Sequence, residues 1–305
     1  MLFLLPIFTQ ILADQPNSDT STLLQQADND VSKNKYADSI PKYQQAIQLF
    51  EQQNDRKALA DTTYKLGGAY LSIGKFTEAR QQLNSALKMH EELNDKSGAG
   101  MDLVRLASIE SHQANYDEAL ELANKALEIH KSIANQKGIA DAYLQIGIAS
   151  LWKDKYDEAL NNIQNALKIY EGINEKKGIT QCHNTIGSIQ WRKGNLDQAL
   201  EEFNKALPLA EETNNKTMMC QILGNMGLIY WNQADSEKAL EYYEKSNAIA
   251  REIGSKTDES INLFNMAIVH LETGEYEEAQ EFYQTSLRMA RDLGDKGLEG
   301  VCLDG

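Results

Sequence analysis

Apolar and small residues recur along this chain at two spacings. Within short segments they return every three or four residues, which is the spacing of one face of an α-helix. The whole pattern then repeats every 40 residues, with no insertion or deletion over seven copies. The clearest marker is a mostly aromatic position, occupied by Tyr36, Phe76, Tyr116, Tyr156, Leu196, Ser236 and Tyr276. An internal repeat of this length predicts a stack of similar helical modules rather than one central core.

Small residues hold fixed places in each copy. Alanine stands three residues after the aromatic position in six copies, and Ser39 stands there in the first; alanine or glycine stands nine residues before it in every copy. Small residues at fixed helix positions let two backbones approach, so that the larger apolar residues between them interlock. Segments rich in turn-forming residues separate the copies, such as LNDKSG at 93–98. Each copy is therefore predicted to form two antiparallel helices of unequal length.

This pattern resembles the tetratricopeptide repeat over about residues 20–305. The second copy carries it most fully, at Leu66, Gly67, Tyr70, Gly74, Phe76, Ala79 and Ala86. The resemblance implies an all-α fold, a right-handed α-solenoid of antiparallel helix pairs. It places seven repeats near residues 20, 60, 100, 140, 180, 220 and 260, with a truncated eighth from about residue 300. The 40-residue length is similar to that of LGN-type scaffold proteins and of bacterial tetratricopeptide signalling proteins.

Two features depart from the family pattern. The aromatic residue is lost at Leu196 and Ser236, and Pro208 falls deep inside the second helix of the fifth copy. A proline there removes the hydrogen bond to the Asn204 carbonyl and is expected to bend the helix. We therefore expect copies five and six to form a softer joint in the stack.

The two ends of the sequence carry separate expectations. Residues 1–13 are apolar but shorter than the roughly 20 residues of a membrane span, so they are interpreted as a secretory signal, or else as an apolar arm on the first repeat. The polar residues 14–19 are expected to be a linker. A cleaved signal predicts an extracytoplasmic protein, whereas an uncleaved segment would leave a cytoplasmic adaptor. Because the repeat pattern stops in mid-helix at Gly305, we expect a fragment that reaches a membrane only through a missing downstream segment.

The family resemblance also implies a binding surface. In this family the first helix of each repeat lines an inner groove, and peptide segments of partner proteins bind there. Positions counted back from the aromatic residue give the candidate partner-binding residues Tyr64, Leu71, Val104, Arg105, His112, Leu144, Leu151, Trp152, Asn184, Trp191, Arg192, Asn225, Trp231, Asn232, Phe264, Asn265 and Leu271. All three tryptophans of the chain fall in this set, in consecutive repeats. Aromatic side chains often anchor a partner, although the alternative is that they pack the ends of neighbouring helices.

The chemistry of this surface suggests its ligand. The inward positions of copies two to seven hold three acids and three bases, namely Asp61, Asp141, Glu272, Lys65, Arg105 and Arg192. The net charge of −15, from 30 Lys+Arg and 45 Asp+Glu, must therefore lie mainly on the second helices and the outer surface. Co-chaperone members of the family grip a carboxylate with lysine and asparagine, and this chain lacks that basic clamp. We expect a protein or peptide segment with apolar side chains rather than an acidic tail.

Composition and motifs argue against other functions. The acidic balance disfavours nucleic acid, which requires a basic surface. Cys182, Cys220 and Cys302 show no CxxC pairing and are interpreted as core residues. His90 and His130 share one repeat position and are interpreted as surface histidines rather than metal ligands. We therefore expect no cofactor, no metal and no catalytic residues, and hence a non-catalytic binding scaffold.

An alternative function rests on analogy alone. Secreted bacterial arrays of this kind often precede a membrane span and a kinase or cyclase module. The chain could then be the extracytoplasmic sensor or input region of a larger signalling protein whose output domain is absent from this sequence.

Overall fold

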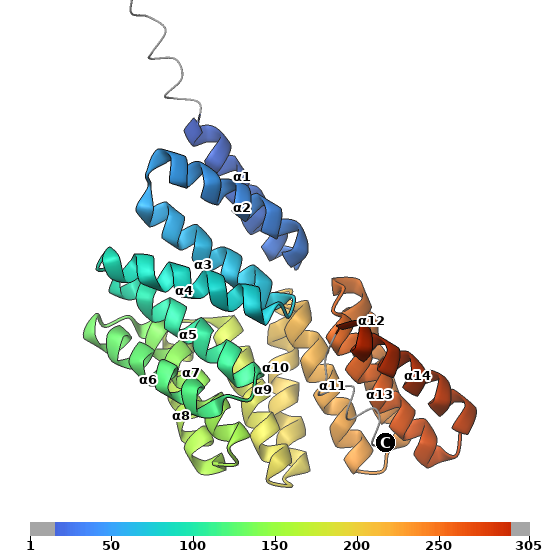
Figure 1. Cartoon of the computed structure of the whole chain (residues 1–305). Helices are drawn as coiled ribbons and strands as arrows, with labels where there is room; N and C mark the ends of the chain where they lie inside the picture. Colours follow the sequence, from blue (N-terminus) through green and yellow to red (C-terminus); the bar gives the residue numbers. More distant parts are fainter. Residues whose placement is uncertain (1–15, 294–305) are drawn as a thin grey trace, which may run out of the picture. The chain divides into compact units, whose positions relative to one another are not determined.

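A computed structural model describes the backbone of residues 16–293 and the side chains of residues 20–293. Fourteen α-helices and no strand occur in this range (Figure 1). They are α1 (Pro16–Ser32), α2 (Tyr36–Gln53), α3 (Arg56–Ser72), α4 (Phe76–Glu92), α5 (Lys96–His112), α6 (Tyr116–Ser132), α7 (Gln136–Trp152), α8 (Tyr156–Gly172), α9 (Lys176–Arg192), α10 (Leu196–Glu212), α11 (Lys216–Asn232), α12 (Ser236–Ile253), α13 (Lys256–Thr273) and α14 (Tyr276–Leu293). The odd-numbered helices are the first helices of the seven repeats, and the all-α solenoid of repeats is confirmed.

The two helices of each repeat have nearly the same length. Every helix is 17 or 18 residues long, so the expected inequality is wrong. The first helices begin about four residues earlier than expected, because residues taken for turns form their first turn. Asp55 and Asp95 cap two of them by accepting hydrogen bonds from the amides of Ala58 and Gly98, both at 3.0 Å. Helix α1 likewise starts at Pro16, inside the expected linker, since proline is favoured at the first helical position.

Each connection between consecutive helices contains one residue with a positive φ, and these residues are spaced by 20. Four are glycines, at Gly74, Gly194, Gly254 and Gly274. The other nine are Asn34, Asn54, Asn94, Ala114, Ala134, Asp154, Asn174, Asn214 and Ala234. Asparagine, aspartate and glycine tolerate the left-handed region, whereas alanine is strained there because its Cβ lies too close to a carbonyl oxygen. The identical placement of these residues keeps every turn the same length.

The chain divides into two compact units, Met1–Lys153 and Asp154–Gly305, so that α1–α7 belong to the first and α8–α14 to the second. In each unit consecutive helices pack against each other, and neighbouring first helices also touch. The small residues predicted at the helix contacts are buried, as expected for close backbone approach. They include Ala46, Ala79, Ala86, Ala119, Ala126, Ala159, Ala166, Ala199, Ala206, Ala239, Ser246, Ala279 and Ser286.

Larger side chains fill the space between these contacts. In the first unit Tyr43 and Leu66 form one cluster, and Leu83 and Ile109 form another. In the second unit Phe203 packs with its neighbours on α10 and α11, and Tyr243 packs with residues of α13. Each core is therefore a series of small clusters between adjacent helix pairs, as a repeat array requires.

The two histidines interpreted as surface residues are buried, so that prediction is wrong. His90 is 1% exposed and His130 is fully buried. Glycines across the turn make room for the rings: a Cβ at Gly98 would lie 2.4 Å from Cδ2 of His90, and one at Gly138 would lie 2.3 Å from Nδ1 of His130. The sequence carried this signal, because each glycine follows its histidine by eight residues.

Other expectations fare differently. Helix α10 continues through Pro208 to Glu212, and the softer joint stays a prediction. Cys182 and Cys220 are buried core residues, as expected. Cys302, the signal at residues 1–13 and the truncated eighth repeat lie outside the described residues. Among the described residues no helix combines the length and apolar character needed to cross a membrane.

The distribution of charged residues between first and second helices agrees with the prediction from the sequence. The second helices carry 25 acidic and 12 basic residues, whereas the first helices carry 10 acidic and 11 basic residues. The excess negative charge therefore belongs to the second helices, and the first helices are close to neutral.

Candidate functional site

Neighbouring first helices lie side by side within each unit: α3, α5 and α7 in the first, and α9, α11 and α13 in the second (Figure 1). Three contacts that join these helices link positions 41 apart in the sequence. Because this separation is one repeat plus a single residue, such a pair links adjacent positions on one face of two successive first helices. We call this surface the first-helix face, which in each unit consists of the candidate residues on its odd-numbered helices.

In the first unit, Tyr64 and Arg105 pack against each other. The guanidinium carbon of Arg105 lies 3.8 Å from the centre of the Tyr64 ring, and Arg105 Nη1 donates to the Tyr64 carbonyl oxygen at 2.9 Å. Burial raises the pKa of Tyr64, so its phenol stays neutral. The positive charge of Arg105 is thus held against an aromatic face by two interactions.

Two aromatic stacks occur near the ends of first helices in this unit. Trp152, which is 47% exposed, stacks on Tyr116 with ring centres 6.4 Å apart and an interplanar angle of 6°. The exposed His112 stacks on Phe76 with centres 5.4 Å apart. Tyr116 was not a candidate site residue. Tyr116 begins the second helix of the repeat that precedes the repeat of Trp152, and this position could have identified it from the sequence.

In the second unit, an asparagine pair crosses from α11 to α9. Asn225 Nδ2 donates to Asn184 Oδ1 at 3.1 Å, and both residues are half-buried. Each amide group offers a donor and an acceptor, so the pairing leaves the NH₂ group of Asn184 and the carbonyl of Asn225 available. Trp191 lies about two helical turns beyond Asn184 along α9, packed against the cluster around Phe203.

Trp231 lies near the end of α11 in the same unit. Its Nε1 donates to Oε2 of Glu272 on α13 at 2.6 Å, and its ring packs against the cluster around Tyr243. The sequence counted Glu272 among the acids of this surface, but the hydrogen bond could not be predicted from spacing. Phe264 is turned partly toward α14, where its ring centre lies 5.4 Å from that of Tyr283.

Most candidate residues are at least partly accessible. Those with intermediate exposure are Tyr64, Leu71, Val104, Arg105, Asn184, Trp191, Arg192, Asn225, Trp231, Phe264 and Asn265. Those that are exposed are His112, Trp152, Asn232 and Leu271. Leu144 and Leu151 differ from the others because they are buried. Nη1 of Arg192 also lies 3.6 Å from Oδ1 of Asp154, so the two side chains form an ion pair.

The tetratricopeptide repeat family matches the chain at residues 19–92, 138–212 and 218–292. A second description of the same repeat matches residues 64–132. No curated protein matches the chain significantly.

Solved structures share its fold at low sequence identity. The crystal structure of a Rap protein complexed with competence and sporulation factor is 18% identical, with a TM-score of 0.75 over 91% of this chain and 76% of that chain. NprR in complex with its cognate peptide NprX is 16% identical, with a TM-score of 0.63 over 96% and 82%. A signal transduction ATPase with a tetratricopeptide repeat sensor from Pyrococcus horikoshii is 18% identical, with a TM-score of 0.58 over 94% of this chain and 44% of that chain.

Proposed function

Because the chain belongs to the tetratricopeptide repeat family, we propose that it is a non-catalytic scaffold whose first-helix face binds a peptide segment of a partner. Two relatives in fold support a peptide ligand, since one was solved with competence and sporulation factor and another with its cognate peptide NprX. The proposal concerns the face on α9, α11 and α13 in particular, where amide and aromatic side chains alternate.

The observation that carries the proposal is the Asn184–Asn225 pair. One residue of an extended ligand presents its N–H donor and its C=O acceptor on the same side of the chain. The free carbonyl of Asn225 and the free NH₂ group of Asn184 match these two groups. Side-chain amides can therefore bind the ligand backbone, as a strand would, without selecting its sequence.

Selectivity would then come from the side chains around the pair. Trp191 and Trp231 each expose part of a large ring whose remainder is packed on the core, so they are held rigidly. Rigid aromatic side chains lose little conformational entropy on binding and are frequent anchors of interfaces. The first helices carry nearly equal numbers of acids and bases, which favours a ligand with apolar side chains over an acidic tail.

A phage-displayed library of random linear peptides, panned against the purified protein, tests the proposal. Peptides that survive selection are synthesised and titrated by calorimetry. We expect enriched apolar residues, and we expect Asn225→Ala and Trp231→Ala each to weaken binding by about tenfold or more. Tyr276→Ala is the control, because Tyr276 is the most exposed aromatic residue among those whose side chains the structure describes, and it lies on the second helix α14.

Two outcomes contradict the proposal. Either the library yields no binder, or the selected peptides bind both face variants as tightly as the wild-type protein while the helical circular dichroism is unchanged. A loss of binding in Tyr276→Ala alone would place the site on the second helices instead.

A sensor region of a larger signalling protein is the second candidate. The similarity to the signal transduction ATPase favours this candidate, because the match covers only 44% of that longer protein. We also propose an extracytoplasmic location, on the ground of the apolar residues 1–13. The intact mass of the native protein tests both: a mass well above 34.2 kDa supports the larger protein, and loss of the first 13 residues supports export.

A further inference from the structure

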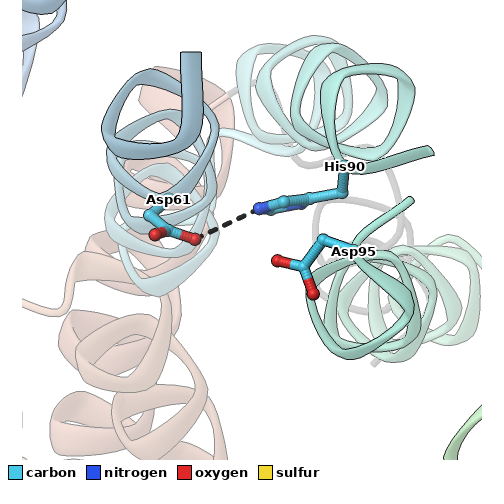
Figure 2. Close-up of side chains that lie close together, drawn as sticks. All are labelled: Asp61, His90 and Asp95. Carbon is cyan, nitrogen blue, oxygen red and sulfur yellow. Dashed lines mark hydrogen bonds and ion pairs between the residues drawn. The ribbon is translucent and has the colours of Figure 1, made fainter. Parts of the chain in front are cut away.

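Three side chains from different elements of the first unit converge at one place (Figure 2). Asp61 lies on α3, His90 lies on α4, and Asp95 is the N-cap residue of α5. Each offers one potential metal-ligand atom, and these atoms lie within 4.8 Å of one another. His90 Nε2 and Asp61 Oδ1 are 3.2 Å apart. A tetrahedral ion bound at roughly 2.0–2.2 Å separates its ligand atoms by about 3.4 Å, so small side-chain rotations would suffice.

A fourth residue fixes the histidine ring. Asp102 on α5 is fully buried, and its Oδ2 lies 2.6 Å from His90 Nδ1. A carboxylate on one ring nitrogen orients the ring and directs the other nitrogen, here Nε2, toward a ligand. The same carboxylate–histidine arrangement supports the metal-binding histidines of many proteins. The ring lies directly against the backbone of Gly98, where any larger residue would collide with it.

A cationic side chain, that of Lys57, already binds the two carboxylates of this cluster. Lys57 Nζ lies 2.9 Å from Asp61 Oδ1 and also bonds Asp95 Oδ2, so an ammonium group joins the two carboxylates. The Lys57 side chain is more than half exposed. It can therefore swing into solvent on its flexible stem and leave the carboxylates to another cation.

A divalent cation can replace Lys57 and a His90 proton in this cluster without changing its net charge. Three carboxylates meet here, while Lys57 supplies one permanent positive charge. The buried Asp102 carboxylate needs compensation from the His90 ring, either by a proton or by a metal ion on Nε2. A doubly charged ion on Nε2, Asp61 and Asp95 would offset most of this negative charge once Lys57 has left.

We propose that Asp61, His90 and Asp95 form a binding site for a divalent transition metal of the Zn²⁺ class, with Asp102 as the residue that positions His90. Nitrogen and carboxylate oxygen ligands suit such an ion, and water would complete its coordination. This site is independent of the proposed peptide scaffold function, because the ligands lie in the first unit and involve none of the asparagine pair.

The repeat supplies a matched control. His130 occupies the same repeat position as His90 and is equally buried. The positions that correspond to Asp61, Asp95 and Asp102 hold Met101, Asn135 and Ala142. His130 therefore has the same fold environment without the acidic ligands, and it should bind no metal.

The experiment titrates the purified full chain with ZnCl₂ by calorimetry at about pH 8, above the ordinary pKa of a free histidine, and records the visible spectrum with Co²⁺. We expect one tight site in the wild-type protein. We expect His90→Gln and the half-exposed Asp61→Asn to weaken it by about tenfold or more, and His130→Gln to leave it unchanged. Lys57→Gln should strengthen binding severalfold, because it removes the competing ammonium group.

The response of Lys57→Gln separates a metal site from an ion-pair network. If the wild-type protein and Lys57→Gln both fail to bind Zn²⁺ or Co²⁺, the cluster is only an ion-pair network and the proposal is wrong. It is also wrong if binding persists unchanged in Asp61→Asn, which keeps the size of the side chain and should fold normally. Should His90→Gln fail to fold, Asp61→Asn and Lys57→Gln decide the question.

Discussion

Replacing the three alanines that occupy left-handed turns with glycine is expected to stabilise the protein. Ala114, Ala134 and Ala234 have φ values of 61°, 52° and 59°. In the left-handed region the Cβ of an L-residue approaches the following carbonyl oxygen, at a cost of roughly 1–2 kcal/mol. Glycine has no Cβ and relieves this strain without changing the turn.

The expected magnitude follows from two opposing terms. Relief of strain gains roughly 1–2 kcal/mol at each site, whereas the more flexible unfolded chain of glycine loses roughly 0.4–1 kcal/mol. The net gain is then about 0.5–1 kcal/mol for each substitution. The three turns are separate along the chain and share no partner, so their effects should add to about 2 kcal/mol.

Urea unfolding followed by circular dichroism measures this gain as a shift of the midpoint. The reverse change provides the control, because Gly74 and Gly194 have φ values of 75° and 82° in equivalent turns, and a Cβ there would meet no atom within 4 Å. Gly74→Ala and Gly194→Ala should therefore lose about 1 kcal/mol each through backbone conformation alone. Repeat arrays can unfold in parts, so amide exchange beside each turn should accompany the global measurement.

The reasoning is refuted if the alanine-to-glycine variants are less stable than the wild-type protein. It is also refuted if Gly74→Ala and Gly194→Ala leave the midpoint unchanged. Either result would mean that the turns relax to accept a side chain.

Three further outcomes are expected. Gly138→Ala should destabilise the protein by about 1–3 kcal/mol in thermal unfolding, because its Cβ would lie 2.3 Å from Nδ1 of the buried His130. The hydrogen bond from His183 holds the pKa of Glu202 below its usual value. This bond therefore stabilises the protein at neutral pH and is lost as the pH falls through the lowered pKa of Glu202, so Glu202→Gln should flatten the acid side of a stability–pH curve. Pro208→Ala should stabilise α10 by about 1–3 kcal/mol and slow its amide exchange, since proline lacks the N–H of a helix interior.

Each of these has a control. Gly172→Ala should stabilise the protein slightly, because no atom lies within 4 Å of the added Cβ. A similar loss in Gly172→Ala and Gly138→Ala would contradict crowding as the cause. An unchanged acid limb in Glu202→Gln would contradict the pKa argument. Exchange in α10 that already matches that of α6 and α8, the second helices of copies three and four, would contradict the softer joint at copies five and six.

The repeat could be predicted from the sequence because its markers are fixed in number and place. Alanines such as Ala79 and Ala119 stand 40 residues apart, and one spacing is enough to predict both the helices and their contact positions. Helix ends were less predictable. Asp55 and Asp95 look like loop residues, and only the structure shows that they cap the helix which follows.

Side-chain contacts between different helices were the part of the candidate site that the sequence could not predict. The face shared by Asn184 and Asn225 follows from the repeat length, since adjacent first helices align at about one period. The hydrogen bond between Trp231 and Glu272 depends on side-chain rotation, which spacing does not determine. The burial of His90 depended on Gly98 across a turn, and without that contact the ring was assigned to the surface.

The even placement of turns has a consequence for how such a chain can change in length. The connections follow one another at a constant interval, and the helices between them are nearly equal in length. A tandem gene duplication of any stretch one repeat long would therefore end at the same point of the cycle at which it began, wherever the breakpoint fell. Both new junctions would join compatible sequences, so the number of modules could grow or shrink by recombination while each existing contact kept its neighbours.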